Sequence, residues 1–346
     1  MRMDRTLTVS LLAWYQANQR DLPWRHTRDP YRIWISEIML QQTRVDTVID
    51  YYTRFLDTFP TVEDLAKADL EVVLKMWEGL GYYRRARLLH QAATIIVEQH
   101  QGQFPRFAEE IEKLPGIGHY TAGAIASIAF EQPALAIDGN VLRVLSRMEA
   151  DPLEGTATSV MKKATRILEP LLPLEQRGDF TQAFMELGAT VCLPNGAPRC
   201  PVCPWQKSCL AHQQGNPLDY PKKEKAKPRP IYHYHLWMME HQGRFALVRR
   251  PEKGVLAGMW QFPLTTMEEG EEPPIHGVVI QLQAEGEYRH IFSHMEWILH
   301  VKRVCFDTIE SNPFTWKTIH EIQETIALPT AFQPAWERIL QRNRTE

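Results

Sequence analysis

The feature that most constrains this chain is a turn rich in proline and glycine, Leu114-Pro115-Gly116-Ile117-Gly118-His119-Tyr120-Thr121-Ala122. Pro115 predicts the end of one helix, and Gly116 and Gly118 predict left-handed turns that expose backbone amides. A helix of small residues, Thr121 to Phe130, follows at once. The pattern predicts a helix-hairpin-helix whose amides and following helix N-terminus bind an anion such as a nucleic-acid phosphate. Taken alone, the hairpin is explained equally well as a tight turn between two packed helices.

An acidic residue follows the hairpin at the start of another helix. After the apolar run Pro133 to Ile137 come Asp138, Gly139 and Asn140, and a helix is predicted from Val141 to Met148. Asp138 suits the N-cap of that helix, because its side chain can accept a hydrogen bond from a free backbone amide. A cap uses only part of a carboxylate, so Asp138 can also face a ligand.

A second carboxyl group, that of Glu37, stands in an apolar helix predicted from Pro30 to Arg44. Isoleucine, tryptophan, methionine and leucine cover nearly all faces of this helix, which predicts burial on most sides. No basic residue lies three or four positions from Glu37, so a helical ion pair does not explain it. Burial raises the pKa of a carboxyl group and can keep it protonated near neutrality, the state that a general acid needs. The alternative is a buried glutamate satisfied by hydrogen bonds alone.

Four of the five cysteines lie close together, with seven, two and five residues between them: Cys192, Cys200, Cys203 and Cys209. The N-terminus has no signal-peptide shape and no apolar run is long enough to span a bilayer, so we expect a cytoplasmic protein. Disulfides are unfavourable there, and the spacing therefore predicts a metal site. The pattern lacks the two C-x-x-C pairs of a zinc ribbon. Cys305 is predicted to lie in the core of a strand.

The periodicity of the sequence divides the chain in two. Helical patterns run to Thr190, and the segment from Asn216 to Pro230, with several lysines and prolines, predicts a linker. Strand patterns follow, and Gln242-Gly243 predicts a hairpin turn. Further helices are predicted near Ile275 to Gln283 and Pro334 to Arg342. The net charge is -3, so a nucleic-acid partner cannot be argued from overall charge and any DNA contact must be local.

From about Leu11 to Cys209 the chain resembles the endonuclease III/MutY family of DNA glycosylases, on the hairpin, Asp138 and the cysteine spacing. The resemblance implies a mainly α glycosylase region over residues 1–215. Its six-helix part covers about 28–137, and its cluster part covers 1–27 and 138–215. The four cysteines are then implied as ligands of a [4Fe-4S] cluster. The family usually has six residues in the first cysteine gap, whereas this chain has seven, within Leu193 to Arg199.

Beyond the linker, residues 216–230, the segment Gly254 to Pro263 resembles the entry of the Nudix (MutT-like) fold and implies a smaller α+β domain over 231–346. The Nudix catalytic box is missing from the sequence, because no Arg-Glu pair and no spaced glutamates follow. We therefore expect this domain to bind and not to hydrolyse. Phe292-Ser293-His294 resembles the loop with which the MutY branch inspects oxidised guanine, and endonuclease III has no such domain.

The MutY branch implies a monofunctional adenine DNA glycosylase of base excision repair. Its implied partner is double-stranded DNA with an adenine:8-oxoguanine or adenine:guanine mispair, and we expect a monomer. The resemblance implies that Glu37 protonates adenine and that Asp138 stabilises the sugar, with Tyr120 and Asn140 beside them. The implied adenine pocket is Trp24, Arg25, Leu40, Val45 and Gln182. The implied DNA or lesion contacts are Gln42, Thr43, Leu80, Tyr82, Gly116, Gly118, Ser293 and His294.

Two other functions compete with this interpretation. A glycosylase with lyase activity, of the endonuclease III type, uses a lysine in the hairpin as an amine nucleophile, and Tyr120 occupies that place here. An iron-sulfur DNA-binding protein that has lost catalysis would act as a lesion sensor, although Glu37 and Asp138 are both retained. Single residues also have plainer explanations. Trp24 fits a connector broken by proline, and Tyr82, bracketed by glycines, fits a core contact.

Overall fold

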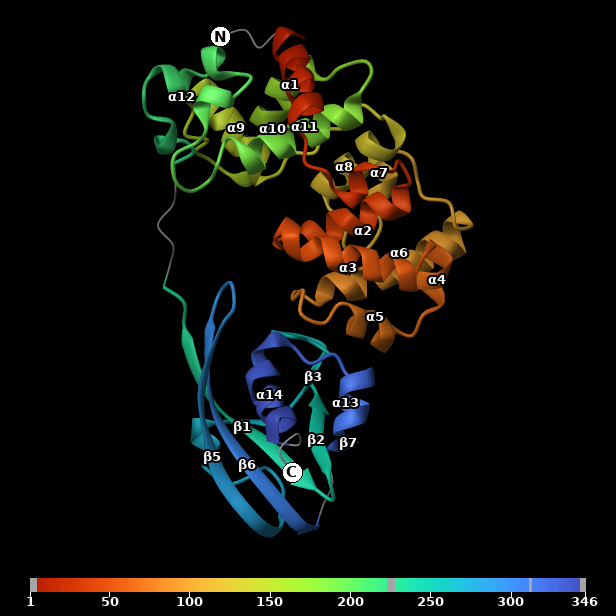
Figure 1. Cartoon of the computed structure of the whole chain (residues 1–346), viewed down its shortest axis with the longest axis vertical. Helices are drawn as coiled ribbons and strands as arrows, with labels where there is room; N and C mark the ends of the chain where they lie inside the picture. Colours follow the sequence, from red (N-terminus) through yellow and green to blue (C-terminus); the bar gives the residue numbers. More distant parts are fainter. Residues whose placement is uncertain (1–4, 223–227, 311–312, 343–346) are drawn as a thin grey trace. The chain divides into compact units, whose positions relative to one another are not determined.

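The computed structural model describes residues 5–222, 228–310 and 313–342. The chain forms two compact units, Met1–Lys67 with Leu88–Lys225, and Ala68–Arg87 with Ala226–Glu346. Figure 1 shows helices throughout the first unit and the sheet in the second. No helix in the described ranges is both long and apolar enough to cross a membrane. The expectation of a helical glycosylase region followed by a smaller α+β domain is confirmed.

The first unit is built from α-helices joined by short loops and single turns of 3-10 helix. The α-helices are α1 (Arg5–Asn18), α2 (Pro30–Leu40), α3 (Val45–Thr58), α4 (Val62–Lys67), α6 (Arg84–His100, whose first turn belongs to the second unit), α7 (Ala108–Ile111), α8 (His119–Phe130), α9 (Gly139–Glu149), α10 (Ala157–Leu168), α11 (Arg177–Thr190) and α12 (Leu210–Gln213). The 3-10 turns are η1 (Pro23–Arg25), η2 (Glu169–Leu171), η3 (Cys200–Val202), η4 (Gln206–Ser208) and η5 (Pro217–Asp219).

Helix α2 carries Glu37 and is shorter than the sequence predicts. It begins at Pro30 behind an N-cap, because the Asp29 side chain accepts from the Tyr31 amide at 2.9 Å. It ends at Leu40 and not at Arg44, since Gln42 takes a left-handed conformation with φ of 58° that breaks the helical hydrogen bonding. Residues 33–39 are all buried, as the apolar pattern predicts.

The hairpin joins α7 to α8, and one of its two glycines has the predicted left-handed conformation. Gly116 is left-handed, with φ of 76°, as expected for a position that favours glycine. The prediction for Gly118 is wrong, because this residue is extended, with φ of -96° and ψ of 175°, and it serves as the N-cap of α8. Helix α8 is buried along Thr121 to Ile128, and its alanines let α2 and α11 approach closely.

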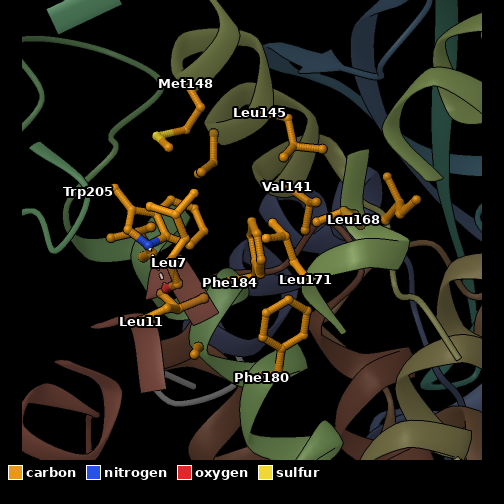
Figure 2. Close-up of a cluster of buried hydrophobic side chains, with 14 of the residues drawn as sticks. Leu7, Leu11, Val141, Leu145, Met148, Leu168, Leu171, Phe180, Phe184 and Trp205 are labelled. Atoms are coloured by element: carbon orange, nitrogen blue, oxygen red, sulfur yellow. Dashed lines mark hydrogen bonds between the residues drawn. The ribbon is translucent and has the colours of Figure 1, made fainter. Parts of the chain in front are cut away.

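A separate core joins α1, α9, α10 and α11 in the first unit. Figure 2 shows its side chains, from Leu7 and Leu11 of α1 to Phe180 and Phe184 of α11. Trp205, from the cysteine-rich segment, inserts into this core with its ring edge against Phe184, at 5.1 Å between centroids. Its indole N–H donates to the Leu7 carbonyl oxygen at 2.9 Å. The cysteine segment is thereby anchored to α1 and α11.

The second unit contains a mixed sheet of seven strands with helices α13 (Ile319–Thr325) and α14 (Gln333–Arg342). It also contains α5 (Leu70–Met76) and the loop that follows it. The strand order is β3-β2-β1-β6-β5, with β1 and β6 parallel, while β4 pairs with β1 and β7 pairs with β2. The strands are β1 (Ile231–His241), β2 (Arg244–Arg249), β3 (Trp260–Gln261), β4 (Leu264–Thr266), β5 (Gly277–Ile291), β6 (Glu296–Ile309) and β7 (Thr315–Thr318), and a 3-10 turn lies at each of η6 (Met267–Glu269) and η7 (Thr330–Phe332).

The strand β1 shows how the sheet separates two cores. Leu236 and Met238 pack with α13 and α14, whereas Trp237 and Met239 pack with Val304 on the opposite face, as strand alternation requires. The predicted hairpin turn at Gln242-Gly243 is present, with φ of 49° and 69°.

One helix prediction in the second unit is wrong. The segment from Ile275 to Gln283 contains the first half of β5, which pairs antiparallel with β6. The run Val278-Val279-Ile280 explains the difference, because β-branched residues favour strands. The predicted helix from Pro334 to Arg342 is confirmed as α14.

The linker predicted from Asn216 to Pro230 falls partly outside the described residues. Its first part contains η5, and β1 begins directly after it at Ile231.

Candidate active site

A cavity of about 230 Å³ in the first unit is lined by residues from far-apart parts of the chain. They come from the loop around η1, from α2 and the turn to α3, from α8, from the start of α9, and from α11. The lining comprises Arg20, Leu22, Trp24, Arg25, Ile33, Ser36, Glu37, Leu40, Thr43, Val45, Tyr120, Ile128, Asp138, Asn140, Gln182, Met185, Glu186 and Ala189. Every residue expected to be catalytic or to contact adenine therefore lines this one cavity.

Glu37 is the buried acid of this cavity, with only 5% of its surface exposed. The Tyr120 hydroxyl donates to Glu37 Oε2 at 3.0 Å. Burial raises the pKa of Glu37 to about 7, the Tyr120 hydrogen bond opposes this, and the neighbouring Asp138 carboxylate raises the pKa further. Burial, with Glu37 beside it, raises the pKa of Tyr120 well above its usual value. Near neutral pH, Glu37 can therefore hold a proton and release it into the cavity.

Asp138 is held in a different environment from Glu37. Its Oδ1 accepts from the Val141 amide at 2.8 Å, which makes it the N-cap of α9, as the sequence predicts. Its Oδ2 accepts from Asn140 Nδ2 at 2.6 Å. Both oxygens thus act as hydrogen-bond acceptors at a helix N-terminus.

Arg143 orients Asn140 from behind the cavity. Its Nη2 donates to Asn140 Oδ1 at 2.8 Å and to the Gly188 carbonyl oxygen at 2.9 Å, and its Nε donates to the Cys192 carbonyl oxygen at 2.8 Å. A side chain at Gly188 would not fit, since an added Cβ would lie 2.6 Å from the Asn140 Cβ. Helices α9 and α11 are thus packed closely at the point where the carboxylate is presented.

The sequence interpretation missed Glu186, a cavity residue whose side chain is fully buried. It accepts hydrogen bonds from Arg20 and Arg25, so the Arg25 guanidinium is already ion-paired on the cavity wall. A signal was present in the sequence, because Glu186 stands in a mostly apolar helix four residues after Gln182, in the same kind of setting as Glu37.

Among the residues of the first unit that were predicted to contact DNA, Thr43 lines the cavity, whereas Gln42, Gly116 and Gly118 do not. Gln42 is exposed on the left-handed turn that ends α2. Gly116 and Gly118 lie in the hairpin, and an added Cβ at Gly118 would meet no atom within 4 Å. The Gly118 backbone is therefore open to a ligand.

In the second unit, Leu80 is buried and Tyr82 is 48% exposed, with φ of 49°. Arg85 lies over the Tyr82 ring, with 5.7 Å between Cζ and the ring centroid. Ser293 and His294 are exposed in the turn between β5 and β6, where the Phe292 amide donates to the Met295 carbonyl oxygen at 2.9 Å.

His294 also lines an open cavity of about 420 Å³ in this unit. The other lining residues are aromatic, basic or small: Tyr232, Tyr234, Arg250, Gly254, Val255, Met295 and Trp297.

The four cysteines line a separate small cavity of about 30 Å³ in the first unit, together with apolar residues such as Val144 and Trp205. Arg147 Nη1 donates to Cys192 Sγ at 3.2 Å. Burial raises the pKa of the Cys203 thiol to about 12, although the Trp205 amide lowers it. Within the described ranges, no group of three or more His, Cys, Asp or Glu side chains is arranged to hold a metal ion. The chemistry of the donor set still fits a metal cluster, because four partly buried cysteine sulfurs line one cavity and Arg147 lies beside one of them.

Comparison with known proteins agrees with both halves of the fold. Residues 35–170 match the family model described as HhH-GPD superfamily base excision DNA repair protein, and residues 234–338 match the NUDIX domain model. The adenine DNA glycosylase of Mus musculus is 38% identical over 362 residues, covering 86% of this chain and 70% of the mouse protein. That of Rattus norvegicus is 40% identical, covering 83% of this chain and 68% of the rat protein. This chain belongs to the adenine DNA glycosylase family.

The solved structures agree with this adenine DNA glycosylase family assignment at the level of the fold. A thermostable thymine-DNA glycosylase is 30% identical with a TM-score of 0.56, and it covers 60% of this chain and 96% of its own. The similarity of the second unit to the Nudix fold is confirmed by the family match over 234–338.

Replacing Glu37 by Gln should remove a pH-dependent loss of stability. As the pH rises from about 4.5 to about 7, the unfolded chain releases the Glu37 proton while the folded protein retains it, so the free energy of unfolding of the wild type falls. The loss is complete above pH 7 and is on the order of 3 kcal/mol. Glu37→Gln should therefore be more stable than the wild type near pH 8, and the difference should vanish toward pH 4.5.

Urea unfolding of both proteins at several pH values measures this difference. Glu109→Gln, at an exposed glutamate, is the matched control. A stability difference between Glu37→Gln and the wild type that stays constant with pH would contradict the assignment of a raised pKa.

Proposed function

We propose that this protein removes adenine from duplex DNA by hydrolysing its N-glycosidic bond, at mispairs with 8-oxoguanine or guanine. The observation that carries this proposal is the presence of two carboxyl groups in one cavity but in opposite environments. Glu37 is buried with a pKa raised to about 7, and Asp138 accepts hydrogen bonds through both oxygens. Glycoside hydrolysis needs this combination, a protonated acid for the leaving group and an anion for the sugar.

In the proposed reaction, Glu37 donates its proton to N7 of the adenine. Because Tyr120 donates to Oε2, the proton is carried on the other carboxyl oxygen. The bond between C1′ and N9 then breaks with its electron pair passing to the base, and adenine leaves as a neutral molecule. Asp138 stabilises the positive charge that develops on the sugar, and water adds to C1′ with loss of a proton.

The adenine must leave the helical stack to reach this cavity, at a cost of a few kcal/mol that is smaller for a mispair. We assign Trp24, Leu40 and Val45 to apolar contacts with the flipped base. Gln182 reads a base edge, because an amide offers a donor and an acceptor together. The Gly116 and Gly118 amides, with Gln42, Thr43, Leu80 and Tyr82, are assigned to the DNA strands around the lesion.

We assign no lyase step to this protein. Tyr120 stands where a lyase of the endonuclease III type carries its lysine, and a phenol cannot form a Schiff base with the opened sugar. The hydroxyl is instead a hydrogen-bond donor to Glu37.

We propose that the four cysteines hold a [4Fe-4S] cluster. Support comes from their sulfurs lining one cavity and from the Trp205 anchor that ties this segment to Leu7. When bound, the cluster would fix the fold of the segment from Cys192 to Cys209. The seven residues of the first gap include Gly196, whose φ is 73°.

We propose that Ser293 and His294 contact the oxidised guanine opposite the adenine. They are exposed on a turn, and the lining of the neighbouring cavity includes the aromatic residues Tyr232, Tyr234 and Trp297 together with Arg250. Aromatic and arginine side chains are suited to stacking against bases. In this proposal the Nudix-like unit binds the lesion and performs no chemistry.

Replacing Glu37 by Gln should abolish adenine release and leave duplex binding nearly unchanged, because the amide keeps the shape of the side chain but cannot act as an acid. Single-turnover release of adenine from duplexes with 8-oxoguanine, guanine or cytosine opposite is the measurement. The exposed variant Glu109→Gln should release adenine at the wild-type rate. Wild-type protein that binds the duplexes without releasing adenine would favour the lesion-sensor alternative.

Replacing Cys200 or Cys203 by Ser should remove the brown visible absorbance, because it removes one ligand of the proposed cluster. Iron and sulfide analysis of anaerobically purified protein measures the same loss directly. Cys305→Ser, in β6 of the second unit, is the matched control and should retain both iron and colour. Stoichiometric zinc without iron in the wild type would overturn the cluster proposal.

Replacing Ser293 and His294 by Ala should reduce the preference for the 8-oxoguanine mispair over the guanine mispair while leaving adenine release measurable. Each lost hydrogen bond is worth on the order of 1 kcal/mol, so a loss of several-fold to tens-fold is expected. The ratio of single-turnover rates on the two duplexes measures the preference. An unchanged ratio would assign lesion recognition to the first unit alone.

A further inference from the structure

Glu186 has its hydrogen-bonding capacity taken up by two arginines. Its Oε1 accepts from the Arg20 backbone amide at 3.1 Å and from Arg20 Nε at 2.8 Å. Its Oε2 accepts from Arg20 Nη2 at 2.8 Å and from Arg25 Nη2 at 2.6 Å. This carboxylate is completely buried, and the Arg25 side chain is only 8% exposed. Such a two-oxygen clamp holds both guanidinium groups in one arrangement.

The clamp also fixes the loop that carries Trp24. Arg25 Nη1 donates to the Arg20 carbonyl oxygen at 2.9 Å, and its guanidinium lies 5.4 Å from the centroid of the Tyr15 ring. The loop is therefore closed on itself and attached to α11 through Glu186. Trp24 lies between the two arginines in sequence and lines the same cavity.

The charges of the cavity lining balance only when Glu186 is counted. Arg20 and Arg25 contribute two positive charges, and Glu186 and Asp138 contribute two negative charges when Glu37 is protonated. Burial alone would raise the pKa of Glu186, but the hydrogen bonds from Arg20 and then Arg25 lower it to about 2. Glu186 is therefore a permanent negative charge over the whole working range of pH.

We propose that Glu186 is a positioning residue for base release. It holds Arg20, Trp24 and Arg25 in the cavity wall, and its negative charge offsets the guanidinium charges in the cavity that Glu37 also lines. This inference rests on the proposed adenine glycosylase activity. Without the Glu186 charge, the cavity would carry an excess positive charge, which favours the ionised form of Glu37. The general acid would then lose its proton at a lower pH.

Other titratable and charged groups also face Glu37 and the Glu186 clamp. Tyr15 of α1 faces Arg25 and Glu186, and Asp46 of α3 faces Arg20. Asp179 and Arg28 also face Tyr15. Tyr120 and Asp138 face Glu37 from α8 and from the start of α9. None of these groups is changed in the variants used below.

The test is the pH dependence of single-turnover adenine release by the full-length protein, between about pH 5 and pH 9. Glu186→Gln should shift the alkaline limb of the profile to lower pH by about one unit. At pH values above the wild-type limb, the variant should release adenine about tenfold more slowly than the wild type. Glu186→Asp keeps the charge and should keep the limb at its wild-type pH. Arg20→Gln, at a side chain that is 38% exposed, should shift the limb to higher pH. The double variant Glu186→Gln with Arg20→Gln should return the limb close to the wild-type position.

A purely structural role would lower the rate without moving the limb. Unmoved limbs in folded Glu186→Gln and Arg20→Gln would therefore overturn the inference. If Glu186→Gln fails to fold, Arg20→Gln and Glu186→Asp still decide it, because a limb that stays at the wild-type pH in Arg20→Gln overturns it alone. A wild-type protein that releases no adenine would instead refute the proposed function.

Discussion

Burial of the Glu37 carboxyl group is the constraint on which the active site depends. The pKa of this group is raised to about 7 because α2 is apolar on nearly every side and its neighbours enclose the carboxyl group. That enclosure requires α8 to approach closely, which its run of small residues permits. It also brings Tyr120, in the first turn of α8, within hydrogen-bonding distance of Glu37. The hairpin before α8 thus serves the acid as well as any DNA backbone that binds to its amides.

The second half of the site depends on a different core. Asp138 is presented by the N-terminus of α9, and α9 is held by apolar contacts with α1, α10 and α11. Trp205 from the cysteine segment completes that core. The residues that would hold a cluster and the residue that would face the sugar therefore belong to one packed body. Arg143 adds polar contacts between the same parts, from Asn140 to the Cys192 backbone. Loss of structure in the cysteine segment would therefore disturb the position of the Asp138 carboxylate.

Local sequence patterns predicted much of the fold, but they did not reveal contacts between residues far apart in the sequence. Apolar periodicity and small residues predicted α2 and α8, and turn residues predicted the hairpin at Gln242-Gly243. Ile275 to Gln283 was wrongly predicted as helix, although its β-branched residues favour a strand and the segment pairs with β6. Glu186 was missed because its arginine partners lie 161 and 166 positions away along the chain. The placement of most cavity residues was expected from a family resemblance and not from periodicity.

The three carboxyl groups of the cavity show why residue type alone does not predict chemistry. Glu37 meets apolar neighbours and a hydroxyl, which favours its neutral form. Asp138 accepts hydrogen bonds from the Val141 amide and from Asn140 at the N-terminus of α9. Glu186 meets two arginines and is an anion whose charge is already compensated. In the proposed reaction, a cavity with this balance would hold a neutral base without excess charge. Proton transfer from Glu37 would then add one negative charge to the cavity as the sugar becomes positive.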